Sequence, residues 1–146
     1  MSNIKNYTSG SPASLSMMNI EKILIELGAR NIAKEYDDHG KVKSIQFSIP
    51  HNGFAMPFKL PAKVEAIKKL FVKEYRRPTA KQIETAGEQA ERTAWKNLLE
   101  WVQLQATMIK LEQVEFLEVF LPYAYSMSEG QTLFERMKGN NFKQLS

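Results

Sequence analysis

The chain has 146 residues, a net charge of +4, 43% apolar and 25% charged residues, and no cysteine. This length and composition are typical of one ordinary globular domain. The absence of cysteine excludes disulfides, thiolate metal sites and cysteine nucleophiles. The sequence opens without the apolar run of a signal peptide, and no stretch reaches the roughly 20 apolar residues of a membrane span. We therefore expect a cytoplasmic protein with no membrane contact.

The first half of the chain predicts a helix followed by three strands. Residues 1–13 are rich in Ser and Gly, and we expect them to form a flexible arm. Apolar residues spaced three and four apart predict a helix from about 14 to 27. Alternating apolar residues, separated by turn sequences, predict an antiparallel meander of three strands at 30–36, 41–49 and 54–60. Pro57 indicates that the last of these strands lies at an edge of the sheet or contains a bulge, because proline cannot donate a ladder hydrogen bond.

The second half predicts helices only. Pro61 stands at the start of an amphipathic helix that ends before Pro78. Thr79 and Gln82 have the spacing of a capping box and open a long helix over 80–112. A short helix is expected within 116–125, and the polar tail beyond it has a further helical segment.

These elements define an α+β fold: a helix, a three-stranded antiparallel meander, a helix, then a long helix with a helical C-terminal cap. The expected division is an arm at 1–13, a small αβββα layer at 14–77, and a helical segment at 78–146. We expect the last two parts to pack together as one domain.

Charge is distributed unevenly along the helical half. Between Lys59 and Lys81 the sequence has eight cationic residues and two glutamates, a net charge of +6. The stretch that follows, to Leu121, has seven glutamates and three cations, a net charge of −4. A basic segment beside an acidic one indicates a polyanionic ligand or an acidic partner.

The basic segment supplies the candidate binding residues. Lys63, Lys69 and Lys73 are predicted to share a helical face that Arg76 and Arg77 extend, and such groups suit phosphate oxygens. The alternative is that lysines solvate the outer face of an amphipathic helix, where cations near its C-terminus also favour its dipole. The candidate set for nucleic acid or an acidic partner is Lys63, Lys68, Lys69, Lys73, Arg76, Arg77 and Lys81.

No constellation in the sequence indicates catalysis. His39 and His51 both fall in predicted turns, without the orienting partner and shielded site of a general base. Glu84, Glu88 and Glu91 share one face of the long helix and could bind Mg²⁺, but a solvated acidic face explains them better. There is no glycine-rich phosphate loop and no Ser-His-Asp set. We predict no enzymatic activity, no cofactor and no metal site.

The apolar half of the long helix carries a seam with spacings of three and four. Trp95, Leu99, Val102 and Ile109 lie along it, and this spacing is typical of helix-to-helix packing. The seam is interpreted as core or as an oligomer interface, in preference to base stacking by Trp95 and Trp101. The sequence leaves a homo-oligomer open.

The order of elements over 14–75 loosely resembles the topology of a double-stranded-RNA-binding domain. Lys63, Lys68 and Lys69 on the closing helix resemble that family's Lys-Lys-x-Ala-Lys phosphate clamp. The family's Gly-Pro-x-His loop is missing, because the corresponding turn reads Asp-Asp-His-Gly at 37–40. The resemblance implies phosphate contacts from this helix and covers about half of the chain.

A second resemblance covers more of the chain. It rests on the segments NYTSGSPASLSMMNIEKILIELGA, FKLPAKVEAIKKLF, EQAERTAWKNLLEWVQLQ and EVFLPYAY. These segments are similar to those of uncharacterised small proteins of phage and prophage genomes. The similarity implies a viral or mobile-element context and transfers no activity and no site.

Three functions follow as hypotheses. The first is a non-enzymatic nucleic-acid-binding accessory protein that contacts the phosphate backbone through its basic helix. The second is a phage-encoded protein-binding module that inhibits an acidic host enzyme or defence protein. The third is a homo-oligomer that binds a small nucleotide.

Overall fold

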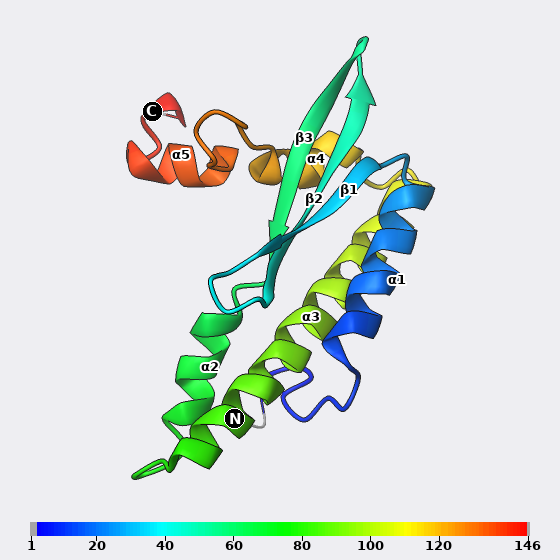
Figure 1. Ribbon diagram of the computed structural model, residues 1–146. Coiled ribbons are helices and arrows are strands. Elements are labelled where there is room, and N and C mark those ends of the chain that lie inside the picture. Colours follow the sequence, from blue (N-terminus) through cyan, green and yellow to red (C-terminus); the bar gives the residue numbers. More distant parts are fainter. Residues whose placement is uncertain (1–2, 146) are drawn as a thin grey trace. The chain divides into compact units, whose positions relative to one another are not determined.

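The computed structural model describes residues 3–145 and has the predicted α+β fold (Figure 1). A helix precedes a three-stranded antiparallel sheet, and the elements that follow the sheet are helices, one of them long. In chain order the elements are α1 (Ala13–Glu26), β1 (Arg30–Tyr36), β2 (Val42–His51), β3 (Phe54–Pro61), α2 (Val64–Val72), α3 (Ala80–Lys110), α4 (Phe116–Phe120), η1 (Leu121–Tyr123), α5 (Leu133–Gly139) and η2 (Lys143–Leu145).

The described residues form two compact units. The first contains residues 3–23 and 62–104, and the second contains residues 24–61 and 105–145. The helices α1 and α3 each run from one unit into the other. The segments 14–77 and 78–146 predicted from the sequence are therefore each shared between both units. None of the helices within residues 3–145 combines the length and the apolar character needed to span a membrane.

In the first unit, α2 packs against the N-terminal half of α3. Phe71 of α2 is buried with Ala86 and Ala90 of α3, which lie one turn apart. Small side chains at these two positions let the helices approach closely. The cluster is completed by partly buried apolar residues, namely Ile4, Val64, Ile67, Val72 and Tyr75. α3 begins at the capping box predicted from the sequence, because Thr79 and Gln82 exchange backbone-to-side-chain hydrogen bonds of 3.0 and 3.1 Å.

The N-terminal segment of this unit is hydrogen-bonded to α3. Thr93 donates its hydroxyl to the carbonyl of Asn6 at 2.7 Å, and Arg92 donates to the carbonyl of Ser9 at 3.1 Å. Lys5 forms an ion pair with Glu100 at 3.1 Å. These residues belong to the arm over 1–13 that we expect to be flexible from its composition, and residues 1 and 2 of that arm lie outside the described chain.

Glu100 makes this attachment sensitive to pH. Burial by itself would raise its pKa, but hydrogen bonds from Lys5 and Asn6 and the charge of Lys5 outweigh burial and lower the pKa. A lowered folded-state pKa stabilises the protein above the unfolded-state pKa, and this stabilisation is lost as the pH falls through the folded-state value. We expect Glu100→Gln to cost about 0.5–1 kcal/mol at pH 7. Thermal melts of both proteins from pH 7 to pH 3 should converge, and a constant difference in Tm would contradict the assignment.

The second unit contains the sheet, in which β2 lies between β1 and β3. One face is apolar, because alternate residues of β2 and β3 point to the same side. Phe47 and Phe58 stack there, with ring centroids 5.3 Å apart, and Phe116 and Phe120 of α4 meet Phe47 edge-on. All the residues of this aromatic cluster come from the second unit, so it is the core of the sheet and α4.

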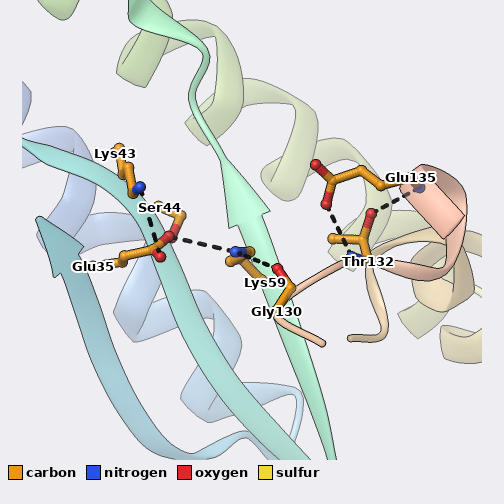
Figure 2. A network of polar contacts seen from close by, with 7 residues as sticks. All are labelled: Glu35, Lys43, Ser44, Lys59, Gly130, Thr132 and Glu135. Atoms are coloured by element: carbon orange, nitrogen blue, oxygen red, sulfur yellow. Dashed lines mark hydrogen bonds and ion pairs between the residues drawn. The ribbon is translucent and has the colours of Figure 1, made fainter. Parts of the chain in front are cut away.

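The opposite face of the sheet is polar (Figure 2). Ser44 donates a 2.7 Å hydrogen bond to Glu35, and Lys59 lies 3.6 Å from the same carboxylate. Lys59 also donates to the carbonyl of Gly130 at 3.3 Å, and its ammonium lies 5.7 Å from the centroid of the Tyr125 ring. Burial would raise the pKa of Glu35, but the hydrogen bond from Ser44 and the nearby lysine charges lower it. The ammonium group of Lys59 is therefore held by contacts within the second unit.

Pro57 lies on an edge strand, as predicted. It pairs with Ser48 of β2, and its carbonyl accepts a 3.1 Å hydrogen bond from the N–H of Tyr125 on the side away from β2. The backbone N–H and C=O of a strand residue point to the same side, so the donor that proline lacks would not have faced β2. Pro57 consequently costs the sheet no ladder hydrogen bond.

Candidate nucleic-acid interface

All seven candidate cations belong to the first unit, on or beside the α2–α3 hairpin. Lys63 is the N-cap residue of α2, Lys68 and Lys69 lie within it, and Lys73 is its C-cap residue. Arg76 and Arg77 lie in the turn between the helices, and Lys81 lies in the first turn of α3. The structure therefore brings the candidate residues together on one helical hairpin. We call the seven residues the hairpin cations.

The hairpin cations are available to a ligand. Six of them are exposed and Lys68 is half-buried. Within residues 3–145, none of the seven forms an ion pair with a carboxylate. Lys59, the remaining cation of the basic stretch, instead contacts Glu35 and lies in the second unit.

The apolar stripe of α2 determines which lysines face solvent. Ile67 and Phe71 pack toward α3, so Lys69 and Lys73, which lie one turn apart, are on the exposed side. Lys68 lies at the helix contact, where its aliphatic carbons approach Gly87 of α3. A Cβ atom at Gly87 would stand 3.3 Å from Lys68 Cε, so glycine leaves room for this stem. The lysine can thus bury its methylene groups while its ammonium extends further.

This contact gives a stability prediction for Gly87→Ala. Glycine in a helix interior costs about 1 kcal/mol relative to alanine, and the atoms that a new Cβ would meet belong to a flexible side chain. We expect Gly87→Ala to raise the free energy of unfolding by about 0.5–1 kcal/mol in urea titrations. In a Lys68→Ala background the gain should be at least as large. Destabilisation in both backgrounds would show that the contact between the helices cannot accommodate a methyl group.

Lys63 has a backbone conformation that lysine rarely adopts. Its φ and ψ are 55° and 47°, in the left-handed region, and its side chain forms no capping hydrogen bond. Glycine or asparagine suits this region better, and Asp, Asn or Ser suits an N-cap better. The positive charge is also unfavourable beside the N-terminus of a helix dipole. Local stability therefore does not explain a lysine at this position.

The acidic residues of α3 face a different direction from α2. Glu84 and Glu88 are exposed and lie on another face of the helix from Ala86 and Ala90, which pack against α2. The carboxylates nearest in sequence to the hairpin cations are Glu65 and Glu74, which leave a net charge of +5 over 63–81. Lys81 lies three residues before Glu84 on α3, so this one hairpin cation adjoins the acidic face, whereas the cations of α2 are not part of it.

Three of the four predicted seam residues lie in the interior of the folded chain. Trp95, Leu99 and Val102 are buried, and Ile109 is half-buried. Trp95 is completely buried, so its ring cannot stack on a base while the protein is folded. Its indole N–H has no hydrogen-bond partner among the described residues. Trp95, Leu99 and Val102 therefore belong to the core.

The two histidines lie at turns. His39 lies two residues after Asp37, whose carboxylate accepts backbone hydrogen bonds from Lys41 and His39. These bonds hold the pKa of Asp37 below its ordinary value. His51 is exposed beside the Asn52-Gly53 turn. Within residues 3–145, no three His, Asp or Glu side chains are grouped so that they could hold a metal ion.

Comparisons with protein-family models, with curated proteins and with solved structures found no match to this chain. A functional assignment therefore has to rest on the chemistry of the residues themselves. The hairpin cations are the strongest such feature, because they combine exposure, a shared location and a lack of carboxylate partners within the described chain.

Proposed function

We propose that the protein is a non-enzymatic nucleic-acid-binding accessory protein that contacts the phosphate backbone through the hairpin cations. The observation that carries the proposal is that seven cations lie on one helical hairpin without forming an ion pair within residues 3–145. Lysine and arginine side chains bind phosphates whatever the base sequence of the nucleic acid, because each contact releases counterions that are condensed on it. Such contacts fix the position of a protein on a nucleic acid without reading its bases.

The positions of two of the cations strengthen the proposal. An amphipathic helix gains from cations near its C-terminus, which accounts for Lys69 and Lys73. Lys63 and Lys81 stand instead at helix N-termini, where the dipole favours carboxylates. The first turn of α3 contains no acidic residue. Cations at both helix starts cost the fold stability, and an anionic ligand on the hairpin would compensate for that cost.

Fluorescence anisotropy with short DNA and RNA duplexes of unrelated sequences tests the proposal. We expect affinity to vary little with sequence and to fall steeply between about 50 and 200 mM salt. If all seven cations contact phosphates, the slope of log K against log salt is about −6, since each contact contributes about −0.9. Affinity that does not depend on salt, or no binding at low salt, would refute the proposal.

An acidic protein partner is the second candidate, since the hairpin cations suit carboxylates as well as phosphates. In this form the protein is a module that inhibits a host enzyme or defence protein. The phage and cytoplasmic setting of both candidates rests on sequence resemblance and composition. A pull-down with and without nuclease distinguishes them. Retention of one acidic polypeptide after nuclease treatment favours the second candidate, and its loss favours the first.

A further inference from the structure

The tip of the β2–β3 hairpin is a two-stranded ribbon without a third strand. β1 pairs with β2 only as far as Ser48, and the bridge from Ala124 reaches β3 only at Phe58. Beyond these points three cross-strand pairs remain, Ile49 with Met56, Pro50 with Ala55, and His51 with Phe54. Figure 1 shows this ribbon projecting past the end of β1. We call residues 49–56 the ribbon.

The apolar face of the sheet continues onto the ribbon. Because side chains alternate along a strand, the side chains of Ile49 and Met56 lie on the same face as Phe47 and Phe58. His51 and Phe54 follow on that face, with their rings edge-to-face and 6.2 Å apart. Phe54 is 57% exposed, although it is a large apolar residue at a fixed place beside a tight turn. The whole stretch 44–58 contains no Asp, Glu, Lys or Arg.

The prolines make strand addition an unsuitable way to cover the ribbon. The carbonyl of Pro57 points away from β2, where it is bonded to Tyr125. In an antiparallel ladder, pairs two positions apart have the same hydrogen-bonding orientation. Pro50 and Ala55 lie two positions from the pair of Ser48 and Pro57, so their backbone polar groups also point away from the partner strand. Pro50 has no N–H, so the two strands of the ribbon offer a single outward N–H donor, that of Ala55. A further strand would find too few partners.

The area of the ribbon argues against a second copy as the occupant. Three residue pairs in two strands cover a face of roughly 10 by 10 Å, on the order of 100 Å² in projection. A stable interface buries about 800 Å² on each partner. Two ribbons packed face to face would bury one face of each, whereas a groove that surrounds the tip would bury both faces and the turn, and therefore more of the ribbon's surface.

We infer that the ribbon is a docking element that inserts into an uncharged, apolar groove of a partner protein, with Phe54 as its anchor. A rigid exposed aromatic residue is the usual centre of such an interface. Positive φ angles at Asn52 and Gly53 match the two-residue turn that preforms the ribbon, so little ordering is required on binding. This inference does not rest on the nucleic-acid proposal, because the ribbon and the hairpin cations belong to different units.

Photo-crosslinking of the full chain tests the inference. A benzoylphenylalanine replaces Phe54 in one protein and Tyr36 in a control, since Tyr36 is an equally exposed aromatic residue of the same sheet. Both are irradiated in a nuclease-treated lysate of the cells that naturally make the protein. We expect position 54 alone to crosslink to one other polypeptide, through apolar residues of that polypeptide. Crosslinks only between copies of this chain, only to nucleic acid, or none at all would overturn the inference.

The captured polypeptide is then purified and its binding measured. Phe54→Asp and Met56→Lys should each weaken its affinity at least tenfold, whereas Tyr36→Asp should leave it unchanged. The Phe54→Asp and Tyr36→Asp proteins should keep the Tm of the parent protein, because both side chains are exposed, and all three variants should keep its affinity for a DNA duplex. Unchanged affinity for the captured polypeptide in both ribbon variants would also overturn the inference.

Discussion

Replacing Arg76 and Arg77 together by glutamate is expected to weaken binding to a DNA duplex by about 50-fold or more at 0.1 M salt. Each phosphate contact contributes a factor of about 8 at this salt concentration, so two lost contacts give about 60-fold before any repulsion is counted. The slope of log K against log salt should also become shallower by about 2. Both side chains are exposed in the turn between α2 and α3, so the fold should tolerate the change. Anisotropy titrations at several salt concentrations measure both quantities.

The control for this experiment is Lys22→Glu with Lys138→Glu. Both lysines are exposed outside the hairpin, and the double replacement changes the net charge by the same four units, from +4 to zero. If the location of the charge matters, the affinity of the control for the duplex should stay within about threefold of that of the parent protein. This small loss measures the effect of net charge alone. Equal losses in the two double variants would show that net charge alone drives binding.

Much of the fold could be predicted because its signals are local. The Asn-Gly dipeptide specifies the tight turn at 52–53, and Thr79 with Gln82 specifies the start of α3. Predictions from local signals are wrong where contacts between distant residues decide the structure. Pro61 has the appearance of a helix start, but it is the last residue of β3, because it pairs with Ser44 across the sheet. The helix begins only at Val64, after Lys63 turns the chain.

The candidate site shows the same division between local and non-local information. Helical periodicity indicates that Lys69 and Lys73 are exposed, and the structure agrees. Nothing in the sequence indicates that Lys68 lies across Gly87, because that contact depends on how two helices pack. The hydrogen bonds from α3 to Asn6 and Ser9 are equally non-local, so composition alone makes the N-terminal segment look free. The ribbon projects because β1 is shorter than β2. The predicted strands at 30–36 and 41–49 already differ in length in this direction.

The core of the first unit gives the second large effect, because Trp95→Ala is expected to lower the free energy of unfolding by about 3–5 kcal/mol. The indole is completely buried, so its loss removes a large apolar surface and leaves a cavity. A domain with a typical stability of about 5–15 kcal/mol would lose a third or more of it. Urea titrations measure the change, and Leu104→Ala on the same helix is the control. Leu104 is 56% exposed, so we expect it to change stability by less than about 0.5 kcal/mol.

Two further observations separate a core role for Trp95 from an oligomer seam. A core residue destabilises each chain on its own, so the unfolding midpoint of the Trp95→Ala protein should not depend on protein concentration. Trp95→Phe should cost much less than Trp95→Ala, because phenylalanine fills most of the space and the lost indole N–H has no partner among the described residues. A midpoint that rises with concentration in the parent protein, and no longer does so in Trp95→Ala, would instead place this residue in an interface between copies. A loss below about 1 kcal/mol for Trp95→Ala would contradict both roles, since neither burial nor an interface would then depend on the indole.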